Sequence, residues 1–377
     1  MSRRPPAPPT ISGFSYIRPL GTGGFATVHL YEQNMPRRAV AVKVLDVRAG
    51  DGFDPEALRE VFEHEADTMA LLSSHPAVVP IYQASISLEG TPYFAMEYCP
   101  DSMGARTSRN PAPLDVVLDT GVRMAGALET AHRARVLHRD VKPSNVLLTT
   151  LERPVLSDFG ISHVIGKQLG DSQQRAMSIP WSAPEVIKMT TTGTVASEIW
   201  STAATLYTFA AGRSPFAKED RSENSRSKIS ARIVKALYTA VPGAHGYELL
   251  DDVLSRAMRK NPEQRYASMA EFGAALQELQ RAYGFDVTPL EVMNPQWVPT
   301  PAETLSRRGP VISNVGRVSR AEARAELLGN RPTDTDGLLL DDRKPAMAKG
   351  VVLGAILGAT VVAAGAAILW AVMGGGW

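Results

Sequence analysis

The chain has 377 residues, and its 40 lysines and arginines nearly balance its 39 aspartates and glutamates, so the formal net charge is +1. A chain this close to neutral, without a zinc-binding pattern, gives no indication of nucleic-acid binding. Its one cysteine, Cys99, excludes a disulfide framework and fits a reducing compartment. The length allows two or more domains.

Residues 1–13 form the first segment with a distinct composition. The stretch from Met1 to Thr10 is rich in proline, basic and without an apolar core, which is not the pattern of a signal peptide. We expect residues 1–13 to be disordered.

Residues 14–98 have the pattern of a small, strand-rich lobe with one main helix. Apolar residues at three-to-four spacing predict that helix over Glu56–Leu72. Short runs rich in β-branched and aromatic residues predict strands at Ser15–Leu20, Ala26–Tyr31, Ala39–Val44 and Pro92–Tyr98.

Two features of this lobe suggest that it binds phosphate groups. Gly21, Gly23 and Gly24 lie between the first two strands, and a turn without side chains at its tip lets backbone amides approach phosphates closely. A glycine-rich turn alone is more often a plain hairpin. Lys43 stands on an otherwise apolar strand, where a lysine needs an anionic partner to keep its charge.

From Pro113 onward the pattern becomes helical, so the strand-rich and helical parts together predict an α+β fold. Apolar periodicity predicts helices at Val116–His132, Glu198–Ala211, Ser227–Ala240, Tyr247–Arg259 and Ser268–Tyr283.

The run Val136–Asn145 carries the clearest chemical signal. Asp140, Lys142 and Asn145 place a carboxylate, an ammonium and an amide close together in sequence. Phosphoryl transfer needs an acceptor for the hydroxyl proton, a cation on the transferring group and a ligand for metal. Taken alone, the run could also be an ordinary surface loop.

Four further motifs surround this run in a set order. Gly21–Val28 and Ala39–Lys43 precede it, and Asp158–Gly160 and Ala183–Glu185 follow it. Together the five motifs resemble those of the eukaryotic-type (Hanks-type) protein kinase family over residues 14–283. The resemblance implies a bilobal kinase fold, with an N-lobe over 14–98 and a C-lobe over 99–283, and the activity of a serine/threonine protein kinase.

The resemblance implies that ATP binds to the N-lobe. Gly21, Gly23 and Gly24 would hold its phosphates, Val28 would contact adenine, and Lys43 would contact the α- and β-phosphates.

Further ATP-site residues follow from the same resemblance. Lys43 would pair with a glutamate of the next helix, where Glu65 has the family spacing and Glu63 is the other candidate. The segment that resembles the hinge between the lobes, whose backbone would bind adenine, contains Met96 as gatekeeper, Glu97 and Cys99.

The resemblance also assigns the catalytic and metal-binding residues. Asp140 would act as the base or orienting group for the substrate hydroxyl, and Lys142 would stabilise the γ-phosphoryl group. In the family this lysine marks serine/threonine specificity. Asn145 and Asp158 would hold Mg²⁺, or Mn²⁺ in its place, through hard oxygen ligands.

Four positions depart from the family pattern. Ala26 replaces the third loop glycine, and Ser178 replaces the threonine that contacts the catalytic aspartate. Glu198 stands in place of an aspartate and Ala203 in place of a glycine. These departures leave a second hypothesis open, in which the domain is a pseudokinase-like scaffold that binds nucleotide or partners without efficient catalysis.

Two arginines have expected anionic partners. Arg139, next to the catalytic aspartate, implies control by phosphorylation of the activation segment at 162–179, with Ser172 as the expected autophosphorylation site. Glu185 is expected to form a structural ion pair with Arg265.

Residues 284–349 have the composition of a linker. Prolines break regular structure in its first part, and charged residues dominate the rest, so we expect a largely disordered juxtamembrane tether. Its hydroxyl groups at Thr300, Thr304 and Ser306 are further candidates for autophosphorylation.

Residues 350–373 contain no charged side chain. About 23 residues at about 1.5 Å each extend roughly 34 Å, enough for a transmembrane helix. The alternative is a buried core helix rich in alanine and glycine. Basic residues precede the span and only the short tail 374–377 follows it, which predicts a single-pass protein of the cell membrane with a cytoplasmic kinase domain.

The span and the tether extend the resemblance to bacterial receptor-type kinases, particularly those of actinobacteria. Gly350, Gly354 and Gly358 recur at the four-residue spacing that allows close packing of membrane helices. This pattern predicts a homodimer, although composition bias alone could also produce it.

Overall fold

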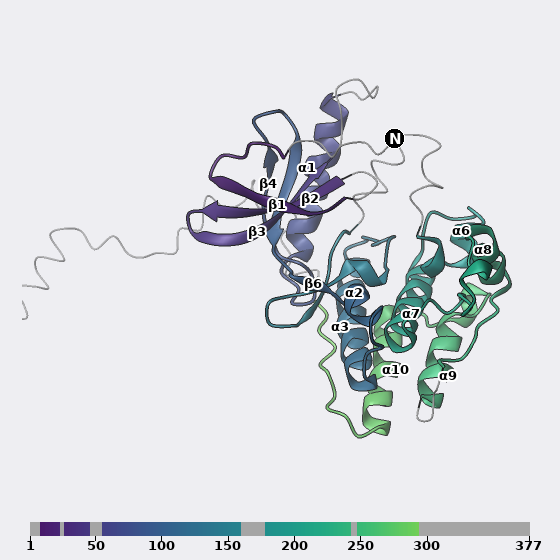
Figure 1. Ribbon diagram of the computed structural model, residues 1–377. Helices are drawn as coiled ribbons and strands as arrows, with labels where there is room; N and C mark the ends of the chain where they lie inside the picture. The colour runs from purple at the N-terminus through teal and green to yellow at the C-terminus, as the bar shows by residue number, and fades with distance from the viewer. Residues whose placement is uncertain (1–7, 23–25, 46–54, 160–177, 243–246, 294–377) are drawn as a thin grey trace, which may run out of the picture. The chain divides into compact units, whose positions relative to one another are not determined.

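The computed structural model describes residues 8–22, 26–45, 55–159, 178–242 and 247–293, which belong to a sheet lobe and a helical lobe (Figure 1). In α1 (Pro55–Leu72), side-chain positions are described from Phe62 onward, with the exceptions of His64 and Glu65.

The sheet lobe contains an antiparallel sheet of five strands in the order β1-β2-β3-β5-β4. The four predicted strands are present, and β4 is an edge strand that the sequence did not predict. Its side chains show no regular alternation between buried and exposed, and its register shifts between Ile81 and Gln83. The strands are β1 (Phe14–Thr22), β2 (Ala26–Asn34), β3 (Arg37–Leu45), β4 (Ile81–Ile86) and β5 (Pro92–Glu97).

The alternation of β3 places Lys43 on one face of the sheet. Val40, Val42 and Val44 pack on the other face, where Ile11 also lies buried. Residues 8–13, expected to be disordered, therefore pack against the sheet, and the Tyr31 hydroxyl donates to the backbone oxygen of Pro9 at 2.6 Å.

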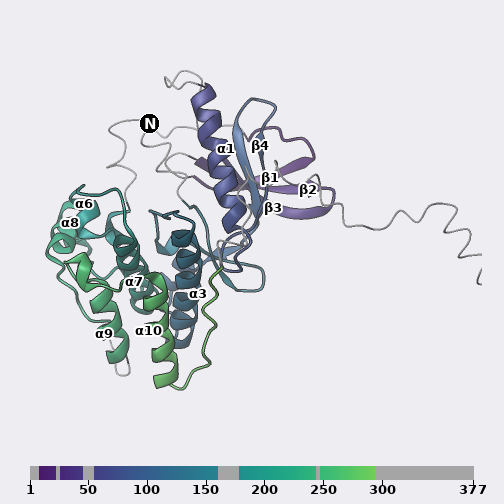
Figure 2. The same ribbon diagram turned by 180° about the vertical axis from the view of Figure 1, so that it is seen from behind.

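Helix α1 packs against the sheet and ends beside the second lobe. Phe62 contacts Phe94 of β5 with ring centroids 4.7 Å apart, while Met69 and Leu72 belong to the large core of the helical lobe. Both Figure 1 and Figure 2 show α1 alongside the sheet. One helix thus links the two cores, so its position affects both lobes.

The helical lobe is built around α7 (Val195–Ala211), most of whose residues are buried. A capping box between Thr194 and Ser197 begins this helix, and Gly212 ends it in the left-handed conformation with φ 69°. The other described helices are α2 (Met103–Thr107), α3 (Leu114–Arg133), α6 (Pro184–Ile187), α8 (Arg226–Lys235), α9 (Glu248–Ala257) and α10 (Met269–Ala282).

The five helices predicted for this lobe are all present, but the one expected to reach Ala240 stops earlier. Helix α8 ends at Lys235 because Ala236 adopts a left-handed conformation with φ 53°, and its amide bonds back to the carbonyl of Arg232. Periodicity alone does not reveal such a stop at a residue other than glycine.

A small sheet lies in the second lobe near the catalytic run. It consists of β6 (Asp101–Ser102), β7 (Val146–Leu148) and β8 (Pro154–Leu156), with β7 following the run and β8 preceding Asp158. These strands are too short to be predicted from a sequence pattern. They nevertheless fix the position of the catalytic run and of Asp158, which lie next to β7 and β8.

Residues 284–293, the first part of the expected linker, pack along α3 and α10 (Figures 1 and 2). In the ranges that the structure describes, no helix is both long and apolar enough to cross a membrane. The span predicted at 350–373, like the candidate phosphosites at Ser172, Thr300, Thr304 and Ser306, lies outside those ranges.

Candidate active site

The carboxylate of Asp140 is the centre of a compact polar cluster. Its Oδ1 accepts a hydrogen bond from the Ser178 hydroxyl at 2.7 Å, and its Oδ2 lies 2.5 Å from Lys142 Nζ. Asn145 Nδ2 donates to the backbone oxygen of Asp140 at 2.9 Å and to Oδ2 at 3.2 Å. The side chains of Asp140 and Lys142 are 25% and 24% exposed, so a substrate can reach both.

Ser178 makes the contact with Asp140 that the family pattern gives to a threonine. Lys142 Nζ also donates to Ser178 Oγ, at 3.2 Å, so the hydroxyl bridges the carboxylate and the ammonium group. Because the contact uses only the oxygen atom, the missing methyl group does not alter it.

The buried side chain of His138 holds the backbone of the catalytic run in place. This side chain is fully buried, its Nε2 lies 2.9 Å from the Ser157 carbonyl oxygen, and its ring packs 4.4 Å from that of Phe159. His138 therefore has a structural role. The run then turns through Arg139, which has φ 65°, and Pro143 starts the 3-10 turn that ends at Asn145.

Glu198 of α7 supports the same run from the other side. Its Oε1 accepts from the Arg139 amide at 2.6 Å, and its Oε2 lies 2.6 Å from His132 Nε2 at the end of α3. Both side chains are almost fully buried. The longer carboxylate thus reaches the loop amide and also bonds α3, a pairing with His132 that the sequence did not indicate. Ala203 lies fully buried in the same helix.

Lys43 and Asp158 form an ion pair that joins the two lobes. Lys43 is nearly buried, with 8% of its side chain exposed, which meets the need for an anionic partner on this apolar strand. Burial acts to raise the pKa of Asp158, but the charge and hydrogen bond of Lys43, together with the electrostatic effects of His138 and Lys142, outweigh burial. The pKa of Asp158 therefore lies below its ordinary value, and the carboxylate is ionised at neutral pH.

Asn145 and Asp158 are close to one another through a backbone connection. The amide and hydroxyl of Ser157 both donate to the Asn145 carbonyl oxygen, at 2.9 and 3.2 Å. An amide oxygen and an ionised carboxylate are hard donors that suit Mg²⁺, an ion that usually keeps several waters, so these residues fit the metal. In the described ranges no group of three or more histidine, cysteine, aspartate or glutamate side chains is placed to hold an ion.

An apolar cluster lies on the Lys43 face of the sheet, where the adenine ring is expected. Register pairs Val28 with Lys43 and Ala41 with Met96, which brings predicted residues of β2, β3 and β5 together. Several residues of this cluster were not predicted from the sequence. Ala41 could have been, because it lies two residues before Lys43 in the strand and so on the same face of the sheet. The cluster contains Ala41, Val79, Met96 and Val155, with Leu20, Val28, Ile81, Cys99 and Leu147 packed against them.

Cys99 lies at the edge of this cluster and is partly buried. Burial, together with the nearby Glu97 carboxylate, raises the pKa of the thiol to about 12. A thiol that stays protonated at neutral pH is a poor nucleophile, so Cys99 has the character of an apolar residue here.

The remaining predicted ATP-site residues are placed in part. Gly21 lies at the end of β1, opposite Val28, and Glu97 ends β5 with its amide bonded to the Pro80 carbonyl oxygen at 2.9 Å. Glu65 lies in α1, but its side chain is outside the described set. Gly23 and Gly24 are outside it as well.

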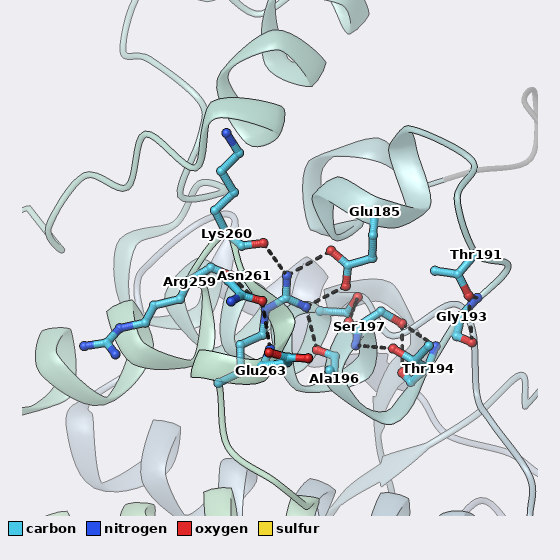
Figure 3. Close-up of polar contacts among 12 residues, drawn as sticks. Glu185, Thr191, Gly193, Thr194, Ala196, Ser197, Arg259, Lys260, Asn261 and Glu263 are labelled. Atoms are coloured by element: carbon cyan, nitrogen blue, oxygen red, sulfur yellow. Dashed lines mark hydrogen bonds and ion pairs between the residues drawn. The ribbon is translucent and has the colours of Figure 1, made fainter.

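Arg265 forms the predicted ion pair with Glu185, and the pair is more extensively bonded than expected. The guanidinium donates to both carboxylate oxygens, at 2.6 and 2.9 Å, and to the backbone oxygens of Ala196, Arg259 and Lys260. The Arg265 side chain is 0% exposed. In Figure 3, Glu185, Ala196 and Lys260 come from separate elements.

A sheet lobe that supplies a buried lysine, together with a helical lobe that supplies Asp140, Lys142 and Asn145, is the arrangement typical of the protein kinase class. Residues 14–278 match the family model of the protein kinase domain, and the chain belongs to this family.

Several mycobacterial kinases are similar to this chain. Serine/threonine-protein kinase PknK of Mycobacterium tuberculosis is 35% identical over 281 residues, which cover 73% of this chain and 24% of PknK. PknB of Mycobacterium leprae is 30% identical over 269 residues, 68% of this chain and 41% of PknB. PknF of Mycobacterium tuberculosis is 30% identical over 318 residues, 80% of this chain and 63% of PknF. The chain therefore spans about a quarter to under two thirds of the length of these relatives.

Proposed function

We propose that this protein is a membrane-anchored serine/threonine protein kinase, which transfers the γ-phosphoryl group of ATP to serine and threonine hydroxyls of proteins, its own included. The proposal is carried by the Asp140 cluster, in which a carboxylate, an ammonium group and a hydroxyl oxygen lie within 3.2 Å of one another. The names of the similar mycobacterial kinases support the choice of serine and threonine as acceptors.

In the proposed reaction, residues of the two lobes take the separate parts of the transfer. The acceptor hydroxyl oxygen attacks the γ-phosphorus, the bond from that phosphorus to the bridging oxygen of ADP breaks, and the hydroxyl proton passes to the carboxylate of Asp140. Lys142 offsets negative charge on the transferring group, and Lys43 on β3 would contact the α- and β-phosphates. When bound, Mg²⁺ at Asn145 and Asp158 would neutralise phosphate charge.

The alternative is a pseudokinase-like scaffold. Its support was the group of departures around the catalytic run, of which Ser178 and Glu198 now have described contacts to that run. Lys43, Asp140, Asn145 and Asp158 are all present, so the sequence retains the groups that catalysis needs.

Radiolabelled ATP distinguishes the two functions. We expect the full chain with Mg²⁺ to incorporate label into itself and into a general protein acceptor, as phosphoserine and phosphothreonine on amino-acid analysis. Removal of the metal with EDTA should abolish the signal, since the phosphate charge is then not neutralised. No label with Mg²⁺, or label on tyrosine alone, would refute the proposal.

The membrane anchor rests on the uncharged run at 350–373. Its length suits a single transmembrane helix, and the basic residues before it favour a cytoplasmic kinase domain. The glycines at 350, 354 and 358 would let two such helices approach closely, so a homodimer through the membrane is part of the proposal.

Charges placed within the span should release the protein from membranes. Leu357→Arg with Val362→Arg adds two charges at the centre of the run, each costing about 2.5–3.5 kcal/mol there. We expect this variant in the soluble fraction, and cross-linking should no longer capture a dimer. The control, Val311→Arg with Val315→Arg, adds the same charges to the linker and should stay with membranes. Equal partitioning of the two variants would contradict the anchor.

A further inference from the structure

Residues 285–293, here called the strap, follow α10 and lie beyond the part of the chain that matches the kinase domain model. In Figure 2 the strap is the green chain that leaves the lower end of α10 and runs beside α3 toward α1. Figure 1 shows the same course from the opposite side. The chain thus returns from the end of the helical lobe toward the sheet lobe.

Thr288 anchors the middle of the strap. Its amide donates to Gln280 Oε1 and its hydroxyl accepts from Gln280 Nε2, each at 2.9 Å. The hydroxyl donates to Asp119 Oδ1, and the carbonyl oxygen accepts from Gln277, both at 2.8 Å. All three polar groups of this buried residue are therefore bonded to side chains of α3 and α10. An anchor of this kind holds the backbone in one register.

Two helix glycines make room for the strap. An ideal Cβ on Gly126 of α3 would lie 2.3 Å from the backbone oxygen of Glu291, and one on Gly273 of α10 would lie 2.8 Å from Leu290. The Met293 amide then donates to the Thr130 hydroxyl at 3.1 Å. Close approach to α3 at Glu291 thus depends on the absence of a side chain at residue 126.

The strap meets the turn after α1 through one hydrogen bond. His75 Nε2 lies 2.9 Å from the backbone oxygen of Glu291, and His75 Nδ1 accepts from the Ala77 amide at 3.0 Å. Because Nδ1 accepts a hydrogen bond, the proton of the neutral ring is on Nε2, which donates it to the Glu291 carbonyl oxygen. Burial lowers the pKa of His75, although its bond to Glu291 opposes that effect, which agrees with a neutral ring.

The same turn is bonded to the strand that leads to Asp158. The Val79 amide donates to the Leu156 carbonyl oxygen at 2.9 Å, and the Leu156 amide donates to the Ala77 carbonyl oxygen at 2.8 Å. Residues 75–79, here called the His75 turn, therefore connect the end of α1, the end of β8 and the strap.

From these contacts we propose that the strap is a positioning element for phosphoryl transfer: through the Glu291 carbonyl it holds the His75 turn, and through that turn it aligns α1 and β8, and with β8 Asp158. The effect on transfer rests on the proposed kinase function. The contact is made by backbone, so the exposed side chain of Glu291 is not part of it. A strap that merely covered apolar surface would need no bond to the His75 turn.

Gly126→Ala tests the proposal in the full chain, because the new methyl group would displace the carbonyl oxygen that His75 contacts. Thr288→Val is a second route to release, since it removes the hydroxyl bonds to Gln280 and Asp119. Alanine also favours helix over glycine, so Gly126→Ala should not weaken α3 itself.

Two matched controls separate positioning from packing. Gly121→Ala places a methyl group in the same helix against Leu206 and Leu276, without touching the strap. Glu291→Ala removes the exposed side chain and keeps the carbonyl. Both controls should leave the strap in place.

Amide hydrogen exchange and ATP kinetics give the readouts. In both Gly126→Ala and Thr288→Val we expect amides at 288–293 and in the His75 turn to exchange at least about tenfold faster than in the wild type. We expect kcat/KM for ATP to fall about fivefold, the size expected for one lost hydrogen bond, with KM for the acceptor protein unchanged. Neither control should show this pairing of effects.

The contrary result is equally specific. If the strap amides exchange rapidly while those of the His75 turn and the kinetics for ATP stay as in the wild type, the strap does not position the site. The same holds if Gly121→Ala gives the same kinetic change. A wild-type chain without transferase activity would refute the kinase function alone, because hydrogen exchange and calorimetric affinity for Mg²⁺–ATP would still decide the role of the strap.

Discussion

Asp140→Asn is expected to lower the rate of phosphoryl transfer by on the order of 10³-fold. The carboxylate has the acceptor oxygens that take the hydroxyl proton, and an amide of the same size cannot accept it, so the general-base contribution is lost. The amide also offers a donor where Lys142 or Ser178 already donates, which misorients the substituted side chain. Initial rates with labelled ATP at saturating Mg²⁺ measure the loss.

Asp252→Asn provides the matched control, because it makes the same chemical change at an exposed position of α9. Its rate should equal that of the wild type. Affinity for Mg²⁺–ATP should stay within about threefold in Asp140→Asn, since the residues facing the nucleotide are untouched, and the melting temperature should change little. Retention of more than about a tenth of the wild-type rate would contradict the assigned role of Asp140.

Arg265→Met is expected to cost about 3–5 kcal/mol of unfolding free energy. Removing one partner of a buried ion pair leaves the other charge without compensation, here that of Glu185, with 15% of its side chain exposed. The backbone oxygens of Ala196 and Arg259 also lose a donor. For a domain of this size the melting temperature should fall by at least about 6 °C, measured by calorimetry.

Two further variants show whether burial explains the cost. Arg256→Met removes an arginine that also pairs with a glutamate, at 2.7 Å from Glu271, and stacks on Tyr266, but its side chain is 44% exposed. It should cost less than about 1 kcal/mol. Adding Glu185→Gln to Arg265→Met removes the uncompensated charge and should restore part of the stability. Equal losses for Arg256→Met and Arg265→Met would contradict the explanation.

The main helices and four strands could be predicted because each carries a local pattern. Buried residues at three-to-four spacing are enough to find α3 or α10, and β-branched runs are enough to find β2 and β3. Strand β4 was not found, because it lies at the sheet edge with no clean alternation. The early end of α8 depends on the left-handed backbone conformation of Ala236, and an alanine side chain does not indicate such a conformation.

The candidate site divides in the same way. Asp140, Lys142 and Asn145 are close in sequence, so their chemistry could be inferred from spacing, and Asp158 and Lys43 followed from the order of the motifs. The role of Glu198 could not be judged from sequence. Whether a longer carboxylate still reaches the Arg139 amide is a matter of distance between α7 and the catalytic run, and its second bond, to His132, joins residues far apart in the chain.

Local sequence, together with the resemblance to the kinase family, was thus sufficient to propose residues for phosphoryl transfer and to predict the lobe that carries each of them. It was sufficient because side-chain chemistry and short-range periodicity are properties of neighbouring residues. How those residues are held was decided only by packing in three dimensions. The support of Glu198 by His132, and the contact of the Glu291 carbonyl with His75, join groups distant in sequence, and a backbone carbonyl carries no signature in the amino-acid sequence.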